Sequence, residues 1–443
     1  MTQQAVDARG RVTTSESSVV DTNTYQSGLG NEFETEALPG TLPIGQNSPQ
    51  KVAHGLVSEL MSGTTFGAPR ALNRRSYLFR IRPSVQHSKF EQVASKNFLT
   101  PPFTLPAAPL DYSWGPFRTS EASVDFIDGL ATICGTGSPH SQSGVAFHAY
   151  SATASMRDRV FGNADGEMLI VPHIGGLHLA TEYGILDVYA GEIAVIPRGV
   201  RFRVELLDGY AAGFVCENFG LPLRLPELGL IGSNGLANVA DFKIPVAAYE
   251  DHDGAVQWTQ KFAGNMWNCE VDHSPLDVVA WRGSLYPYKY DLHRFVAMST
   301  STVDHPDPSI FSLLTSPSDP ILGPNFDVMA ITPRWVVGDH TFLAPGFHRN
   351  CVTEFLMVLQ GHFGGLEPGC TTLTNSYTPH GPDAETQGAL RDGVLGPMKV
   401  EDQLMLLFET RFPVQITDFA NSVLPAVEDY SKQWDGIPKR FGQ

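Results

Sequence analysis

Short runs of β-forming residues recur through the middle of the chain. Between positions 167 and 206, five apolar runs of four or five residues follow one another, at 168–171, 177–181, 185–189, 193–196 and 202–206. Single or paired glycines, and a Pro-Arg-Gly turn at 197–199, separate these runs. Short strands at such close spacing, with turn residues between them, predict a β-meander, a sandwich or a barrel.

The same pattern divides the chain into two β-rich regions, at about 25–263 and about 295–418. Between them, Ser274 followed by Pro275 and Asp277 predicts a capped helix over 274–281. A second helix is predicted over 426–434, after Pro425. Residues 1–23 lack any periodicity, which predicts a disordered tail. We therefore expect an N-terminal β-domain over 24–285 and a C-terminal domain over 286–443.

Composition supports a mostly β protein with a large core. Apolar residues make up 42% of the 443 positions, whereas charged residues make up only 17%. The 42 glycines and 32 prolines require frequent turns. The formal net charge of −17 argues against a nucleic-acid partner, because binding to phosphate backbones needs clustered lysine and arginine.

The five cysteines are scattered and include no CxxC pair, which favours a reducing compartment over a disulfide framework. The N-terminal segment is polar and lacks the apolar core of a secretory signal. No run of about 18 apolar residues is present, so no membrane span is predicted. We therefore expect a cytoplasmic protein with no membrane association.

Residues 191–202 resemble the second cupin motif, G-x5-P-x-G-x2-H, in which glycine and proline form the turn between two barrel strands. Phe202 stands where metal-binding cupins have a histidine. Because an apolar ring cannot coordinate a cation, this half is expected to bind no metal and to pack Phe202 among apolar neighbours. The alternative is an ordinary Gly-Pro-Gly hairpin that only looks like the motif.

Residues 348–361 resemble the end of the first cupin motif, with Asn350 in place of its second histidine. His348, Asn350, Val352 and Glu354 are spaced two apart, so on one strand they would share a face. His380, fixed by neighbouring Pro379 and Gly381, would be a third ligand. Two imidazoles and one carboxylate form the facial triad of non-haem Fe(II) oxygenases. A hydrolytic zinc site could use the same ligands, and histidines that bind nothing are the remaining alternative.

Ten segments in order closely resemble homogentisate 1,2-dioxygenases, and together they span nearly the whole chain. They include Y-Q-S-G-L-G-N-E-F at the start of the first region and H-G-P-D around His380. The chain is identified as a member of this family from the segments at 25–33, 47–50, 62–70, 80–83, 125–129, 226–238, 304–311, 333–335, 348–350 and 380–383.

The resemblance implies a cupin-type fold (jelly roll or β-sandwich) in two domains, with few helices and the metal site in the C-terminal half. It implies Fe(II)-dependent cleavage of the ring of homogentisate by O2 to give maleylacetoacetate, in tyrosine and phenylalanine breakdown. It also implies assembly into a homo-oligomer, a trimer or a hexamer built as a dimer of trimers. The family's iron ligands match His348, Glu354 and His380, and its catalytic histidine matches His305.

An imidazole such as His305 can take the proton of a ring hydroxyl, because its pKa lies near neutrality. A purely structural histidine in the turn formed by Pro306 and Pro308 is the alternative. The expected substrate contacts are Arg349, Asn350, Phe363 and His380.

Two departures from the family pattern lie near the proposed ligands. Phe363 stands where the family usually has a tyrosine whose hydroxyl contacts substrate, and losing such a hydrogen bond costs about 1–3 kcal/mol. The Gly/Ser/His-bearing stretch before the last ligand is also altered, to P-G-C-T-T-L-T-N at 368–375. These changes are explained either by a paralogue that cleaves another substituted hydroquinone or gentisate-like ring, or by neutral drift in a true homogentisate enzyme.

Two functions from other classes remain open. The chain could be a non-catalytic, metal-poor cupin that binds a ligand or acts as a scaffold. It could also be a zinc or nickel cupin that acts as a hydrolase or isomerase. Dependence on O2 and on Fe(II) separates both from a dioxygenase.

Overall fold

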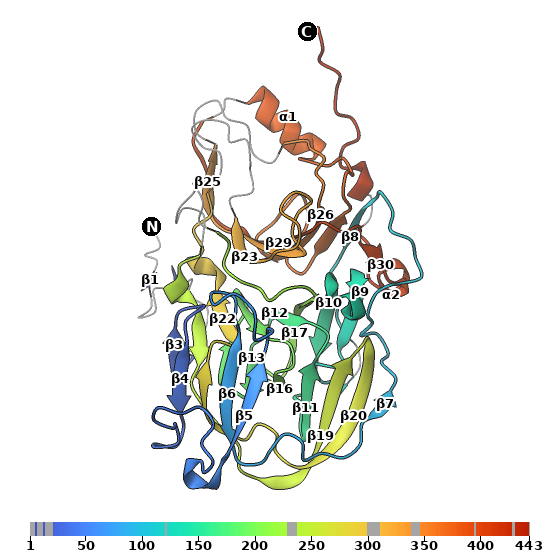
Figure 1. Ribbon diagram of the computed structural model, residues 1–443. Helices are drawn as coiled ribbons and strands as arrows, with labels where there is room; N and C mark the ends of the chain where they lie inside the picture. The colour runs from blue at the N-terminus through green and yellow to red at the C-terminus, as the bar shows by residue number, and fades with distance from the viewer. Residues whose placement is uncertain are drawn as a thin grey trace.

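The computed structural model describes residues 5–6, 12–13, 21–119, 122–227, 237–298, 311–337, 346–393, 396–427 and 430–442. The predicted mostly β architecture is confirmed, with the strands arranged in open sheets (Figure 1). Within these ranges the α-helices are α1 (Ala384–Asp392) and α2 (Asp418–Ser422), and neither is long and apolar enough to cross a membrane. Short 3-10 turns lie at Ala53–Gly55, Pro139–Ser141, Val239–Asp241, Leu292–Arg294 and Tyr430–Lys432.

A nine-stranded sheet forms the centre of the molecule. All five apolar runs predicted between positions 168 and 206 are strands, and two of them, β12 and β15, belong to this sheet. In spatial order its members are β3 (Tyr25–Ser27), β18 (Lys243–Pro245), β22 (Tyr288–Asp291), β15 (Glu192–Ile196), β12 (Glu167–Ile174), β17 (Ala211–Asn218), β10 (Ser143–Ala152), β9 (Leu130–Ser138) and β30 (Gln415–Ile416).

A seven-stranded sheet packs on one face of the central sheet and contains the other three predicted runs. Its pairs are antiparallel except that β11 and β19 run parallel. In spatial order its members are β14 (Gly184–Val188), β13 (Leu177–Thr181), β16 (Arg201–Leu206), β11 (Arg159–Asn163), β19 (Asp253–Phe262), β20 (Asn265–His273) and β7 (Glu91–Val93).

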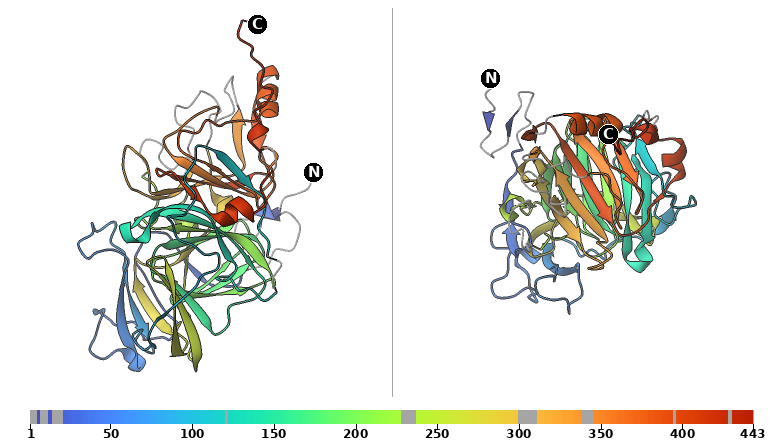
Figure 2. Two further views of the ribbon diagram at one scale, coloured as in Figure 1. Left: turned by 90° about the vertical axis from the view of Figure 1, so that its right-hand side faces the viewer. Right: turned by 90° about the horizontal axis from the view of Figure 1, so that it is seen from above.

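A six-stranded sheet covers the opposite face of the central sheet and carries most of the C-terminal strands. In Figures 1 and 2 these orange and red strands form a layer of their own beside the green strands. In spatial order its members are β23 (Ser312–Ser316), β24 (Phe326–Ile331), β29 (Leu404–Thr410), β26 (Thr353–Gln360), β27 (Thr371–Thr374) and β8 (Asp111–Trp114).

Smaller sheets complete the fold. A four-stranded sheet orders β4 (Phe33–Glu36), β21 (Val278–Gly283), β6 (Arg75–Arg80) and β5 (Val57–Ser62). Two strand pairs are β25 (Arg334–Val337) with β28 (Met398–Val400) and β1 (Ala5–Val6) with β2 (Val12–Thr13).

Strand β10 holds the three layers together, because neighbouring side chains of a strand point to opposite faces. Phe147 faces the six-stranded sheet and stacks on Phe355 of β26, with ring centroids 4.3 Å apart and an interplanar angle of 13°. The next residue, His148, faces the seven-stranded sheet and contacts Phe98 edge-on. Both Phe147 and His148 are almost completely buried.

Each half of the chain contributes a strand to a sheet of the other half. Strand β8, from the expected N-terminal domain, pairs with β27 at the edge of the six-stranded sheet. In return, β30 from the C-terminal half pairs with β9 of the central sheet. The indole nitrogen of Trp114 in β8 donates to the carbonyl of Ala420 at 2.8 Å. The domain boundary at 285/286 stays a prediction, and in space strands from the two sides of it are interleaved.

Residues 21–23, predicted to belong to a disordered tail, lie on the folded body. Asp21 is buried and forms an ion pair of 2.9 Å with the ammonium group of Lys289, and the amide of Asn23 donates to Asp187 at 2.6 Å. These contacts hold residues 21–23 on the folded body, because the buried Lys289 requires carboxylate partners. The pair β1–β2 also falls within the predicted tail, and the rest of residues 1–20 lies outside the described ranges.

The helix predicted over 274–281 is wrong, since residues 278–283 form β21. Ser274 does accept a hydrogen bond from the amide of Leu276, as a cap would. However, Arg80 and the amide of Arg82 both bind Asp277, and β21 is paired on both sides by β4 and β6. Tertiary pairing has overridden a local helix signal here.

The helix predicted over 426–434 is wrong in its described part. Ala426 forms a β-bridge with Trp114, and only the 3-10 turn at Tyr430–Lys432 follows. Sequence patterns missed both observed α-helices. Helix α1 begins after Asp383, whose carboxylate accepts from the amide of Thr386 at 2.7 Å, and this is an ordinary N-cap.

The contact between layers predicts the effect of truncating Phe147. Replacing Phe147 by alanine removes a fully buried ring from the contact between two sheets, and we expect the free energy of unfolding to fall by about 3–5 kcal/mol. Urea unfolding measures this quantity. Phe262→Ala is the matched control, since its ring is 58% exposed on β19 and its loss should cost about 0.5 kcal/mol or less. Equal losses in the two variants would contradict the layered packing.

Candidate metal centre

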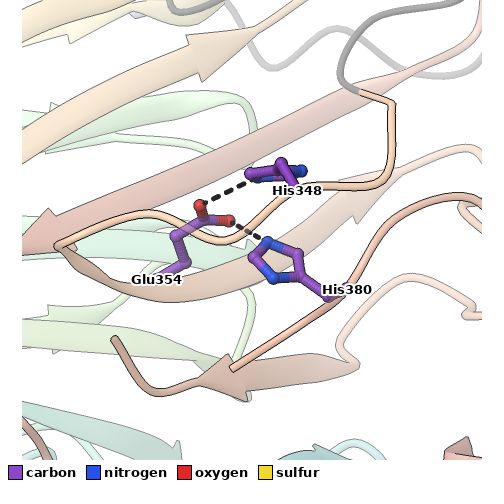
Figure 3. A group of neighbouring side chains, drawn as sticks. All are labelled: His348, Glu354 and His380. Atoms are coloured by element: carbon purple, nitrogen blue, oxygen red, sulfur yellow. Dashed lines mark hydrogen bonds and ion pairs between the residues drawn. The ribbon is translucent and has the colours of Figure 1, made fainter. Parts of the chain in front are cut away.

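Two histidines from separate loops face one another across an isolated β-bridge. The amide of His348 donates to the carbonyl of His380 at 2.9 Å, and the amide of His380 donates back at 3.2 Å. Residues directly opposite in an antiparallel pair carry their side chains on the same face. The two imidazole rings therefore lie side by side, with centroids 4.1 Å apart (Figure 3).

Glu354, the second residue of β26, brings a carboxylate to the same point. Its Oε1 lies 3.6 Å from Nε2 of His348, and its Oε2 lies 3.3 Å from Nε2 of His380 (Figure 3). One ligand atom from each residue falls within 4.8 Å of the others. Within the described ranges, no other three His, Cys, Asp or Glu side chains form a group that could hold a metal ion.

The prediction that residues 348–354 form one strand is wrong. Strand β26 begins only at Thr353, and the chain bends at residues 351 and 352, where the amide of Val352 donates to the side chain of Asn350 at 3.2 Å. His348 pairs instead with the loop that carries His380. The three predicted ligands meet because of this bend and the β-bridge, and the two-residue spacing is not the cause.

Backbone carbonyls set the orientation of both imidazoles. Nδ1 of His348 lies 2.8 Å from the carbonyl oxygen of Gly346, and Nδ1 of His380 lies 3.0 Å from that of Thr378. A carbonyl can only accept, so each Nδ1 carries a hydrogen, and Nε2 is left to face Glu354. This is the arrangement that orients histidine ligands in metal sites.

The electrostatics of the site favour a shared cation. Burial acts to raise the pKa of Glu354, but hydrogen bonds with His348 and His380 overcome that effect and hold this pKa at about 2. Burial acts to lower the pKa of His380, yet the Glu354 carboxylate raises it above its ordinary value. Three acceptors in contact repel one another unless a proton or a metal ion lies among them. The donor set of two imidazoles and one carboxylate fits a divalent metal, with Fe(II) and zinc both compatible.

Two polar residues, Asn350 and Thr374, neighbour Glu354. The side-chain amide of Asn350 donates to Oε1 of Glu354. On the neighbouring strand β27, Thr374 lies directly opposite Glu354 and donates from its hydroxyl to Asp111 at 2.7 Å. Burial raises the pKa of Asp111. The charge of His380 acts to lower this pKa, and the charge of Glu354 acts to raise it. Thr374, in the altered stretch at 368–375, therefore holds a carboxyl group of β8 where it interacts electrostatically with His380 and Glu354.

A cleft of about 680 Å³ opens beside the two histidines. Arg349, expected as a substrate contact, lines this cleft and is exposed. The aromatic contribution of Trp434 was not predicted, because this residue lies more than fifty residues beyond His380 and no local signal connects the two. Its indole nitrogen donates to the carbonyl of Gly381 at 3.3 Å. The residues lining the cleft are Phe347, His348, Arg349, Pro379, His380, Trp434 and Ile437.

The remaining predicted site residues lie elsewhere. Phe363 is 43% exposed in a tight turn, where its amide and that of Leu366 exchange hydrogen bonds with each other's carbonyls. It does not belong to the group that lines the cleft. Asn350 directs its amide to Glu354. Contact of Phe363 and Asn350 with substrate stays a prediction, and His305 lies outside the described residues.

The packing predicted for Phe202 is confirmed. Its ring is completely buried and meets Phe161 edge-on, with centroids 5.7 Å apart. The glycines of the cupin-like motif lie in two turns, Gly191 before β15 and Gly199 after it, at positive φ values of 89° and 84°. Only glycine adopts this backbone conformation without strain.

Two family models together match nearly the whole chain. The model described as Homogentisate 1,2-dioxygenase N-terminal matches residues 24–292, and that described as Homogentisate 1,2-dioxygenase C-terminal matches residues 293–441.

Several solved structures of cupin-like proteins resemble the chain only distantly. A cupin 2 conserved barrel domain protein from Leptotrichia buccalis is 10% identical, with 66% of this chain and 91% of that chain covered and a TM-score of 0.28. A mutant of Bacillus subtilis oxalate decarboxylase is 9% identical, with 71% and 81% covered and a TM-score of 0.30. The bacterial pirin of Escherichia coli in complex with nickel(II) is 8% identical, with 68% and 99% covered and a TM-score of 0.27.

The geometry predicts different effects for the three ligands and for the residue that supports them. His348→Ala, Glu354→Ala and His380→Ala should each lose bound Fe(II), because each removes one of only three protein donors. Asn350→Ala should keep the ion but bind it about 10–100-fold more weakly, since it removes a hydrogen bond that orients a ligand. Metal content after desalting and competition with a chelator measure both effects.

The matched control is Asn421→Ala, an exposed asparagine in α2. It should bind metal as the unchanged protein does. A fully loaded variant at any of the three ligand positions would remove that residue from the proposed site.

Proposed function

Because the chain belongs to the homogentisate 1,2-dioxygenase family, we propose that it cleaves the ring of homogentisate with O2 at an Fe(II) ion. His348, Glu354 and His380 would hold that ion. The observation that carries this proposal is the convergence of two oriented imidazoles and one carboxylate within 4.8 Å, beside a cleft large enough for an aromatic ring.

The proposed reaction opens the ring of 2,5-dihydroxyphenylacetate beside the carbon that bears the acetate arm. Both oxygen atoms enter the product, maleylacetoacetate, so that substrate and O2 account for all of its atoms. When bound, Fe(II) would act as a Lewis acid toward a ring hydroxyl and bring O2 next to the ring.

The protein's own groups prepare the site for this chemistry. Glu354 supplies one negative charge and the imidazoles supply none, so a divalent ion held there keeps a net positive charge. The hydrogen bonds from the imidazole Nδ1 atoms to Gly346 and Thr378 hold both rings in place before any ligand binds. Such preorganisation lowers the cost of placing the reacting atoms.

The cleft suits an aromatic ring that carries an anionic arm. Phe347 and Trp434 offer apolar surface, and rings of this kind pack in offset or edge-on arrangements. Arg349 would pair with the acetate carboxylate, for which a guanidinium has matching geometry. His305 is proposed as the group that accepts the proton of the ring hydroxyl.

A second candidate substrate is a hydroquinone without an acetate arm. One feature favours it: Asp111, which accepts from the Thr374 hydroxyl and interacts electrostatically with His380 and Glu354. A carboxyl group at that point disfavours a second carboxylate and accepts a hydrogen bond from a neutral substituent. Assembly into trimers or hexamers is a further proposal, which light scattering coupled to gel filtration would test.

Oxygen uptake by the Fe(II)-loaded protein tests the function. With ascorbate present, we expect one O2 to be consumed per homogentisate, with formation of the ring-opened product. Gentisate and methylhydroquinone complete the panel, and faster turnover of methylhydroquinone would favour the second candidate.

Three results would contradict the proposal in different ways. No uptake with any of the three substrates would remove the dioxygenase function and favour a non-catalytic cupin. Turnover that proceeds without O2 on a zinc- or nickel-loaded protein would favour a hydrolase or isomerase. Full uptake by the metal-free protein would separate the reaction from the proposed centre.

His305 should affect the rate without affecting the metal. If it moves a proton, His305→Ala should keep bound Fe(II) but lose about 10²–10⁴-fold in kcat. His140→Ala, which removes an exposed histidine from a 3-10 turn, is the matched control and should behave as the unchanged protein does. Loss of iron from His305→Ala would instead identify a ligand or a structural support.

A further inference from the structure

A second set of ionisable side chains lies buried in the N-terminal half, between the central sheet and the seven-stranded sheet. Glu217 of β17 and His148 of β10 have no exposed surface, and Lys261 of β19 is 1% exposed. Asn163 of β11 completes the group (these strands are labelled in Figure 1). None of these residues takes part in the proposed reaction.

Every polar atom of the Glu217 carboxylate has a partner. Oε1 accepts from the amide of Asn163 and from the ammonium group of Lys261, each at 2.6 Å. Oε2 accepts from Nε2 of His148 at 3.1 Å and also from Lys261. The ammonium group lies 4.5 Å from the centroid of the Phe98 ring, which adds a cation–π contact.

The charges of this cluster balance. Burial acts to raise the pKa of Glu217, but Lys261 and His148 overcome that effect and hold this pKa at about 2. Burial lowers the pKa of His148, which keeps its ring neutral, and the Thr132 hydroxyl lies 2.9 Å from its Nδ1. One carboxylate and one ammonium group therefore neutralise each other in a space closed to water.

The positions of the contacting atoms match those of the proposed metal centre, although Nε2 of His148 donates a hydrogen that a bound metal ion would have to displace. In each case Nε2 of a histidine meets Oε2 of a glutamate, at 3.1 Å for His148 and Glu217 and at 3.3 Å for His380 and Glu354. In each case an asparagine amide, from Asn163 or from Asn350, donates to Oε1 of that glutamate. The two sites differ in the remaining group, which is the imidazole of His348 in one and the ammonium of Lys261 in the other.

We propose that the N-terminal half contains a second cation site, built from His148, Glu217 and Asn163, which Lys261 fills with its own ammonium group and closes to metal ions. The occupant would otherwise be a divalent transition-metal ion, because imidazole and carboxylate are its ordinary ligands. A buried carboxylate needs a cation in either case. Because the ammonium group of Lys261 is part of the chain, this cation is present whichever metal ions are in solution. Metal binding is then confined to the C-terminal half.

The test removes the ammonium group and asks whether a metal ion replaces it. Lys261→Ala is made together with Glu354→Ala, so that the C-terminal centre is silent, and the protein is refolded from urea with or without Co²⁺. We expect one Co²⁺ per chain after desalting, an absorption band from nitrogen and oxygen ligands, and a Tm several degrees above that of the metal-free sample. Glu354→Ala alone should retain no ion and gain no Tm.

Two matched variants separate ligand binding from other effects. Adding His148→Ala to the first pair removes an imidazole donor and should abolish both the band and the gain in Tm. Replacing Lys261 by methionine and Glu217 by glutamine together removes both charges at similar volume, and this protein should fold without metal and ignore Co²⁺. Folding of that variant would show that the site requires balanced charge and not the lysine itself.

The proposal is overturned if the Lys261→Ala protein binds no additional ion, or if it remains unfolded with Co²⁺ as well as without it. It is also overturned if the His148→Ala addition leaves the bound ion in place. If the Glu354→Ala protein itself retained an ion, that result would count against the C-terminal centre. Binding of one more ion by the protein that also carries Lys261→Ala would still support the second site.

Discussion

The two-residue period of strand β10 is the constraint on which the arrangement of the molecule depends. Phe147 and His148 are neighbours in sequence, so they must point to opposite faces of the central sheet. One face receives an aromatic ring that stacks on Phe355 and packs against the C-terminal sheet. The other receives an imidazole that completes the buried charge cluster around Glu217. A shift of one residue in the register of this strand would exchange the two environments and place a polar ring in the apolar layer.

Glu217 and Glu354 are two of the glutamates that carry a negative charge out of bulk water in this fold, and their surroundings balance that charge differently. Glu217 is completely buried, and a lysine from the facing sheet neutralises it. Glu354 lies at the edge of a cleft, where two imidazoles surround it and solvent can reach the group. The first environment is closed and electrically complete, which suits a structural role. The second environment is open to solvent, and no lysine or arginine among the described residues neutralises its carboxylate. Such an environment suits binding of a metal ion and a substrate.

The interleaving of the halves connects the candidate site to the whole chain. Strand β8 is separated from β27 by more than 250 residues in sequence, yet it forms the edge of the sheet that carries Glu354. It brings Asp111 to Thr374 and anchors Trp114 on the carbonyl of Ala420. The surroundings of the candidate metal ligands are therefore decided partly by residues of the first half. Exchange of strands in both directions also makes independent folding of either half unfavourable, because each would lack an edge strand.

The sequence by itself determined the elements whose signals are local. Short apolar runs with glycine between them located five consecutive strands correctly, since such runs and their turn residues are read within a few positions. The three metal-ligand candidates were found in the same way, from residue types and from resemblance to a family.

Tertiary structure decided what depends on partners distant along the chain. Residues 278–283 became a strand because β4 and β6 pair with them on both sides, although a helix cap precedes them. The three ligands meet through a bend and a β-bridge, whereas their spacing had suggested a single strand. Trp434 and Asp111 come to the candidate site from segments more than 300 residues apart, and the lysine beside Glu217 comes from a facing sheet. Contacts of this kind leave no trace in local periodicity, because they are set by the packing of whole layers.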